Sequence, residues 1–106
     1  MEIDNKAIKD WLHHMDIWDY DICDCPVHFR IVHVVGNVDI SNRLLDRIPF
    51  QFGYVSGDFD CGENELLTLK GCPVEVGRDF YCYGNSFSGP PDRSHIIHIG
   101  STFRWK

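Results

Sequence analysis

No apolar run in this 106-residue sequence approaches the ~18 residues that a membrane-spanning helix needs. Basic residues are also scarce, because 10 lysines and arginines stand against 16 aspartates and glutamates, a net charge of −6. A nucleic-acid-binding groove needs a basic stripe, so direct nucleic acid binding is not expected. The first residues, which include Glu2 and Asp4, lack the apolar core of a secretory leader. We therefore expect a cytoplasmic protein without membrane contact.

Catalytic signatures are missing as well. The sequence contains no phosphate-binding loop, no nucleophile elbow and no H-E-x-x-H motif. The spacing of Ser94, His95 and His98 implies no catalytic geometry. We expect neither an enzyme nor a cofactor, and acid–base chemistry on clustered carboxylates with raised pKa values is the remaining catalytic alternative.

Two groups of possible metal ligands lie in the first third of the chain. The acidic group is Asp16, Asp19, Asp21 and Asp24, and the mixed group is Cys23, Cys25, His28 and His33. The acidic group lacks the central Gly and terminal Glu of an EF-hand loop. The mixed group does not have a usual zinc-finger spacing. A solvated acidic face and ordinary core and surface roles are favoured over metal sites.

What the sequence does contain is an internal repeat. Residues 59–66 and 80–87 both read apolar, any, apolar, any, any, Asn, any, apolar, which is the L-x-L-x-x-N-x-L pattern of a leucine-rich repeat. Val38, Phe59 and Phe80 are separated by 59 − 38 = 21 and 80 − 59 = 21 residues. The same step relates three more apolar sets: Ile40, Cys61 and Cys82; Ile48 and Leu69; and Val34, Val55 and Val76.

The spacing has a physical meaning. Two apolar residues two positions apart, such as Phe59 and Cys61, point to one face of a short strand. The amide of Asn64 then lies where the chain leaves the strand, and it can satisfy buried backbone groups. Since Cys61 and Cys82 are inward and the total of five cysteines is odd, we expect reduced thiols that act as small hydrophobic residues.

These patterns predict an α/β repeat protein, a short leucine-rich-repeat-like solenoid with a parallel sheet and an N-terminal capping helix. We expect one domain over residues 1–106, with a helical cap at 1–26, repeat rungs at 27–87 and a degenerate last rung or cap at 88–106. The apolar spacing predicts a helix over residues 5–15, capped by Asp4 or Asn5. The β-rich stretch 27–35 should lie beside the first repeat strand, 37–41.

The repeats resemble those of small leucine-rich-repeat-like proteins encoded by tailed bacteriophages and related mobile elements. The resemblance is carried by residues 34–42, 48–61, 69–73 and 76–82 and by the Trp11-Leu12 helix. It covers roughly residues 5–87, and the chain departs from the pattern after Ser88. The resemblance implies the fold, a phage origin, a binding role and a location in the host bacterial cytoplasm.

The outward residues of the predicted strands form the candidate site, which consists of Asp39, Asp58, Asp60, Asp79, Tyr81 and Tyr83. Four carboxylates within a few ~4.8 Å strand spacings repel one another, and we expect that folding does not need them. A basic partner would relieve this repulsion, while the tyrosines would supply rigid anchors. The alternative is a solvated face whose aspartates only limit aggregation and whose tyrosines pack on each other or on Trp105.

We therefore expect a non-enzymatic protein-binding module. Combined with the resemblance, this predicts an inhibitor of a host protein or nucleoprotein complex with a basic surface, in the manner of an anti-defence or anti-CRISPR protein. The alternative is a structural or assembly protein of a phage particle that self-associates through its repeats.

Overall fold

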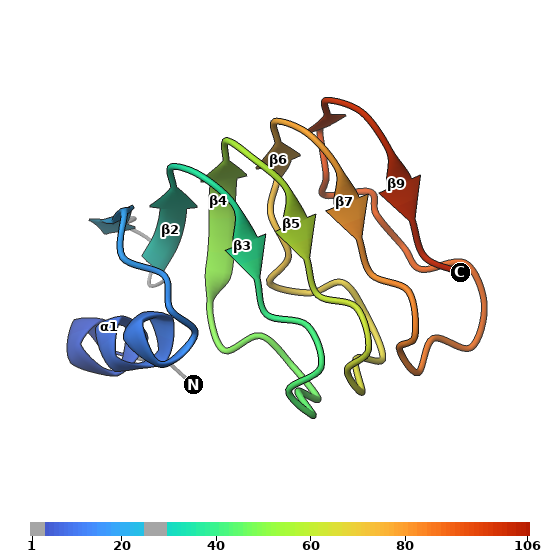
Figure 1. Ribbon diagram of the computed structural model, residues 1–106, viewed down its shortest axis with the longest axis horizontal. Helices are drawn as coiled ribbons and strands as arrows, with labels where there is room; N and C mark the ends of the chain where they lie inside the picture. The colour runs from blue at the N-terminus through green and yellow to red at the C-terminus, as the bar shows by residue number, and fades with distance from the viewer. Residues whose placement is uncertain (1–3, 25–29) are drawn as a thin grey trace.

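A computed structural model describes residues 4–24 and 30–106, which form a β-solenoid of about four turns behind one N-terminal helix (Figure 1). The elements are α1 (Asn5–His14), β1 (Tyr20–Asp24), β2 (Arg30–Val34), β3 (Val38–Asp39), β4 (Gln51–Val55), β5 (Phe59–Asp60), β6 (Glu75–Val76), β7 (Phe80–Tyr81), β8 (His98–Ile99) and β9 (Phe103–Arg104). Within this described part of the chain, no helix has the length and apolar composition required to cross a bilayer.

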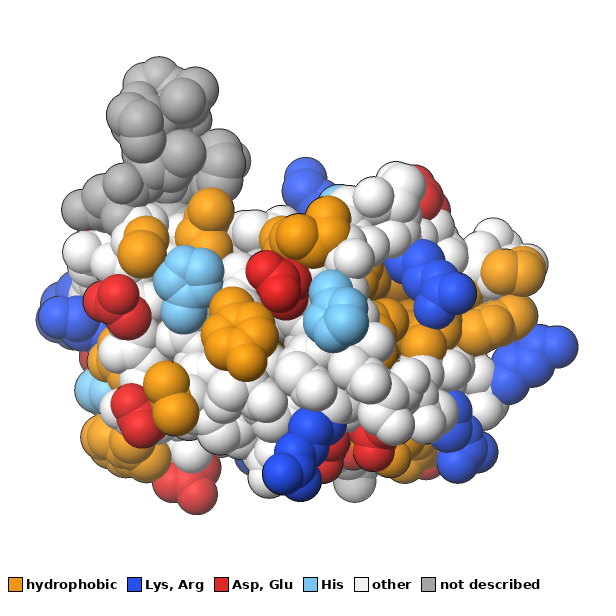
Figure 2. All heavy atoms as spheres, turned by 90° about the horizontal axis from the view of Figure 1, so that it is seen from above, with side chains coloured by type: hydrophobic (Ala, Val, Ile, Leu, Met, Phe, Trp, Pro, Cys, Tyr) orange, Lys and Arg blue, Asp and Glu red, His pale blue; other side chains and the backbone are white. Residues whose placement is uncertain are grey.

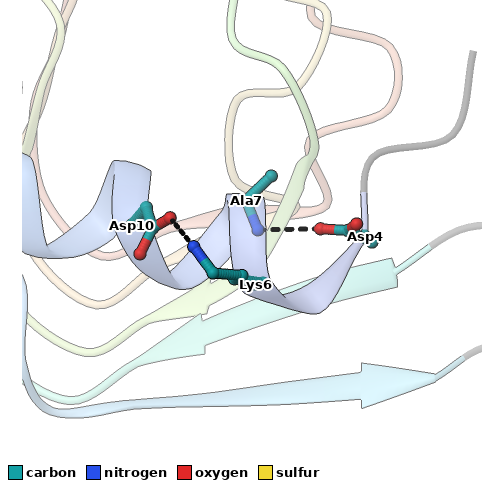
Figure 3. A network of polar contacts seen from close by, with 4 residues as sticks. All are labelled: Asp4, Lys6, Ala7 and Asp10. Atoms are coloured by element: carbon teal, nitrogen blue, oxygen red, sulfur yellow. Dashed lines mark hydrogen bonds and ion pairs between the residues drawn. The ribbon is translucent and has the colours of Figure 1, made fainter.

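Helix α1 begins as its sequence predicts. The carboxylate of Asp4 accepts the N–H of Ala7 at 2.8 Å, and an exposed ion pair between Lys6 and Asp10 follows (Figure 3). Leu12, on the opposite side of the helix, is fully buried. Beside it, the ring of Trp11 meets Phe50 edge-on, with centroids 5.1 Å apart. The amphipathic stripe therefore packs the helix onto the first turns of the solenoid.

Each turn contributes one strand to each of two sheets. Sheet A has the order β1-β2-β4-β6-β8, and sheet B has the order β3-β5-β7-β9. All pairings are parallel except that of β1 with β2. The four strands of sheet B lie side by side in Figure 1, and those of sheet A lie behind them.

The predicted position of the strand before the first repeat is wrong. Strand β2, from the predicted stretch 27–35, pairs with β1 and β4, whereas β3, from the stretch 37–41, pairs with β5 in the other sheet. The chain changes sheets at Gly36, whose φ of 109° is a left-handed conformation that favours glycine. Residues 25–29, at the start of the predicted stretch, lie outside the described residues.

The apolar columns pair in the predicted register. Phe59 is aligned with Val38 on one side and with Phe80 on the other, and Phe103 follows in the last turn. The rings of Phe52, Phe59, Phe80 and Phe103 form a continuous edge-to-face row with centroids 5.3, 5.2 and 5.3 Å apart. The predicted 21-residue repeat and the shifted last rung are therefore confirmed.

A buried asparagine closes the turn after β5. Its Oδ1 accepts the backbone N–H groups of Arg43 and Leu45, both at 3.0 Å, and its Nδ2 donates to the carbonyl of Ile40 at 2.9 Å. This residue is Asn64, and Asn85 bonds the backbone in the same way one turn later. The role predicted for the repeat asparagine is confirmed, because these amides satisfy backbone groups that the turns would leave unpaired.

The repeat cysteines pack inside the solenoid. Cys61, Cys72 and Cys82 are fully buried free thiols. A hydrogen bond with Cys72 and burial raise the pKa of Cys61 well above its usual range, and burial raises the pKa of Cys82 to about 12. Both thiols are thus kept protonated and act as small core residues.

Candidate protein-binding face

The pairing of β3, β5, β7 and β9 sets one row of side chains on the outer side of sheet B. Asp39 pairs with Asp60, Asp60 with Tyr81, and Tyr81 with Arg104. The preceding residue in each strand points into the core, and its neighbour in the row therefore points outward. We call this surface the sheet B face.

A second row lies two residues further along each turn and consists of Ser41, Gly62, Tyr83 and Lys106. The ring of Tyr83 leans over the preceding turn, because a Cβ built on Gly62 would lie 3.5 Å from its Cε1 atom. Tyr81 meets the same ring edge-on at a centroid distance of 6.4 Å, and the guanidinium of Arg104 lies 5.9 Å from it on the other side. The two tyrosines therefore form a connected aromatic centre on the face.

Charge changes sign along the sheet B face. Its first two turns carry Asp39 and Asp60, its third carries the tyrosines, and its fourth carries Arg104 and Lys106. Four of the predicted site residues are thus brought together, and two basic residues join them. Within residues 4–24 and 30–106, the only ion pair joins Lys6 and Asp10 of the helix, so these face charges have no ionic partner there.

Asp58 and Asp79 have a different position and a structural role. They lie at the corner between the sheets, where Asn37 accepts the N–H of Asp58 at 2.8 Å, Asp58 that of Asp79 at 3.0 Å, and Asp79 that of Thr102 at 3.0 Å. Each side chain thus caps the backbone of the next turn. The expectation that folding does not need these carboxylates is wrong for Asp58 and Asp79, because they satisfy N–H groups that the sharp corner leaves without a strand partner.

The hydrogen bonds of the two carboxylates on the face stay within one turn. Asp39 accepts the N–H of Ser41 at 3.0 Å, and Asp60 accepts that of Gly62 at 2.9 Å. Burial raises the pKa of Asp60, and the nearby charge of Asp39 raises it further, while the Gly62 bond opposes them. This carboxylate is therefore under electrostatic strain that a basic partner would relieve.

The electrostatics at the corner are opposite. The backbone N–H of Thr102 lowers the pKa of Asp79, and the hydroxyl of Tyr81, which donates to Asp79 at 2.8 Å, lowers it further. The same hydrogen bond raises the pKa of Tyr81. Asp79 therefore holds Tyr81 in place as well as capping the next turn.

The outer side of sheet A carries a second polar row that the sequence analysis did not single out. Tyr54, Glu75 and His98 are paired across β4, β6 and β8, and two histidines lie in a row with an acidic and a hydrophobic side chain in Figure 2. His33 lies over Gly53, and its Nδ1 is 2.9 Å from the N–H of Tyr54, which it accepts. The same 21-residue step, 54 − 33 and 75 − 54, marks this row, but its members share no chemistry that would have drawn attention to it.

The groups considered for metal binding are placed only in part. Cys25 and His28 lie outside the described residues. In the acidic group, Asp16 accepts the indole N–H of Trp18 at 2.8 Å, and Asp21 lies in the hairpin strand β1. Among the residues that the structure describes, no three histidine, cysteine or acidic side chains converge on one point.

The sequence analysis omitted strand β1, because it contains Asp21 and Asp24, which disfavour strands. Comparisons of the chain with models of protein families, with curated proteins and with solved structures found no match.

Proposed function

We propose that this chain is a non-enzymatic, leucine-rich-repeat-like protein-binding module and that the sheet B face contacts the partner. The position of Asn64, which bonds the backbone on leaving its strand, supports the leucine-rich-repeat-like assignment. The observation that carries the function is the division of labour among the polar residues. Asn37, Asp58 and Asp79 hold successive turns together, whereas the sheet B face makes no side-chain bond between turns apart from aromatic and cation–π contacts.

The partner that suits the acidic half of the face is a basic protein surface. Asp39 and Asp60 would steer such a surface toward the first two turns, and Tyr83 would bury a rigid ring against it. The resemblance to phage proteins supplies the setting, a host protein or nucleoprotein complex in the bacterial cytoplasm. The module would inhibit that complex, as an anti-defence or anti-CRISPR protein does.

A second candidate is a structural or assembly protein of a phage particle. The presence of Arg104 and Lys106 on the same face as Asp39 and Asp60 favours it, because a wholly acidic face would repel its own copy.

Affinity capture from a bacterial lysate at low and high salt tests the first proposal. The parent is compared with a face variant, Asp39→Lys, Asp60→Lys and Tyr83→Ala, which leaves the structural Asp58 and Asp79 intact. A control variant carries Tyr54→Ala and Glu75→Lys on sheet A. Circular dichroism establishes that all three fold.

We expect one protein, identified by mass spectrometry and then purified, to bind the parent and the control at low salt and to lose the face variant. Equal binding of that purified protein by the face variant would remove the sheet B face from the proposed function. Capture of the chain alone would favour the structural role instead.

A further inference from the structure

We infer that the sheet B face pairs with the same face of a second copy of this chain, about a two-fold axis parallel to the strands. The inference rests on the proposed role of this face in protein binding and names one partner for it. It follows from the order of charges along the solenoid and from the register of the four strands.

An axis parallel to the strands reverses the order of the turns and keeps the position along each strand. The first turn of one copy then faces the fourth turn of the other, and the second faces the third. Asp39 lies opposite Arg104 of the second copy, and the symmetry produces this ion pair twice. Both side chains are exposed and have no ionic partner within the described part of their own chain.

The centre of the face is also complementary. Asp60 lies opposite Tyr81 of the second copy, so a carboxylate meets the positive edge of an aromatic ring. Tyr83 leans from the third turn over Gly62 of the second turn, which places its ring near the middle of the four-turn face. The two-fold axis passes there, and the two copies of Tyr83 therefore pack against each other as the apolar centre of the interface.

Other arrangements of the two faces are less favourable. An axis along the solenoid would set Asp39 against Asp39 and Arg104 against Arg104. In the arrangement that we infer, the one pair of like charges is Asp58 opposite Asp79, at the corner that bounds the face. Each of these carboxylates already accepts a backbone N–H in its own chain. The sheet A row offers no matching ion pair, since its ends are His33 and His98.

Sedimentation equilibrium from micromolar to millimolar concentration, at low and high salt, tests the inference. We expect the parent to pass from monomer to dimer, with weaker association at high salt. Asp39→Arg alone and Arg104→Asp alone should each weaken the dimer at least about tenfold, because each sets like charges against each other. The double variant should recover the parent's association, because it restores both ion pairs with their signs exchanged.

Two controls isolate the effect of charge. Asp39→Asn keeps an acceptor for Ser41 and should weaken the dimer less than Asp39→Arg does. Glu75→Lys, on sheet A, should leave association unchanged. A parent that stays monomeric at every concentration, or a double variant that associates no better than the single variants, would overturn the inference.

The outcome is separable from that of the proposed function. If the parent remains monomeric but the captured protein still needs the sheet B face, the face binds another protein and the dimer is wrong. If the charge exchange restores the dimer and no captured protein depends on the face, self-association is its role and the proposed host partner is wrong.

Discussion

Asp79 and Asp60 lie on neighbouring turns, and the fold moves their carboxyl pKa values in opposite directions. Asp79 accepts the N–H of Thr102 and the hydroxyl of Tyr81, so its ionised form is favoured in the folded state. Asp60 is partly buried among other carboxylates, so its ionised form is disfavoured. Two residues that look alike in the sequence therefore affect stability with opposite signs.

Asp79→Ala should lower the free energy of unfolding at pH 7, because the N–H of Thr102 loses its acceptor. Since the folded-state pKa of Asp79 is lowered, the stabilisation by its charge is present above the unfolded-state pKa of about 3.9 and is lost as the pH falls through the folded-state pKa. Urea unfolding of parent and variant at pH 7 and near pH 3 should show a difference that shrinks in acid. An equal difference at both pH values would contradict this assignment.

Asp79→Asn and Asp60→Asn are the matched controls. Asp79→Asn should retain more stability than Asp79→Ala at pH 7, because an amide oxygen can accept the same N–H, as Asn37 does in the first turn. Asp60→Asn keeps an acceptor for Gly62 and removes a charge that the fold disfavours. It should therefore not lower stability at pH 7.

The corner between the sheets is the element that constrains side-chain size most severely. A Cβ on Gly77 would overlap the carbonyl oxygen of Ser56, and one on Gly100 would overlap that of Gly77. Gly77→Ala should therefore force adjacent turns apart and cost roughly 1–3 kcal/mol, as overpacking does. Thermal unfolding should show the loss.

Gly89→Ala is the control for this substitution, because a Cβ there meets nothing within 4 Å. It should leave the melting temperature almost unchanged. If Gly77→Ala behaves like Gly89→Ala, successive turns do not approach as closely at the corner as the structure shows.

The elements differ in how well the sequence predicts them. Helix α1 and the strands of sheet B follow from periodicity, because each repeats an apolar spacing that only one conformation explains. Sheet A was not predicted, since β6 and β8 are two residues long and their outward residues, Glu75 and His98, share no property. Strands this short are specified by the turns stacked on either side rather than by local propensity.

The corner column shows a different kind of miss. Asn37, Asp58 and Asp79 are separated by 58 − 37 = 21 and 79 − 58 = 21 residues, so the repeat was visible in the sequence. The polar column was assigned wholly to the binding face because acidic residues are usually solvated. A short polar residue that recurs at the repeat period also fits a backbone cap, and the structure shows that it has this role.

At the scale of the whole molecule, the edge-to-face phenylalanines run along the solenoid as one continuous core. Phe80 is fully buried between Phe59 and Phe103. Phe80→Ala should leave a cavity between two turns and cost on the order of 3–5 kcal/mol, measured by urea unfolding. Phe103→Ala should cost less, because Phe103 is only partly buried. Equal and small losses at both positions would argue against a shared core.

The alignment of the turns has a further consequence for the length of the molecule. The 21 residues from Phe59 to Asp79 begin after one corner carboxylate and end with the next, so removing them would join Asp58 directly to Phe80. The junction would read Asp-Phe as before, Asp58 would cap the following turn, and both sheets would keep their register. A gene for this protein can therefore gain or lose whole turns by unequal recombination without creating a new kind of junction. Such a scaffold varies in discrete steps of one turn, whereas an insertion of any other length would misalign both sheets at once.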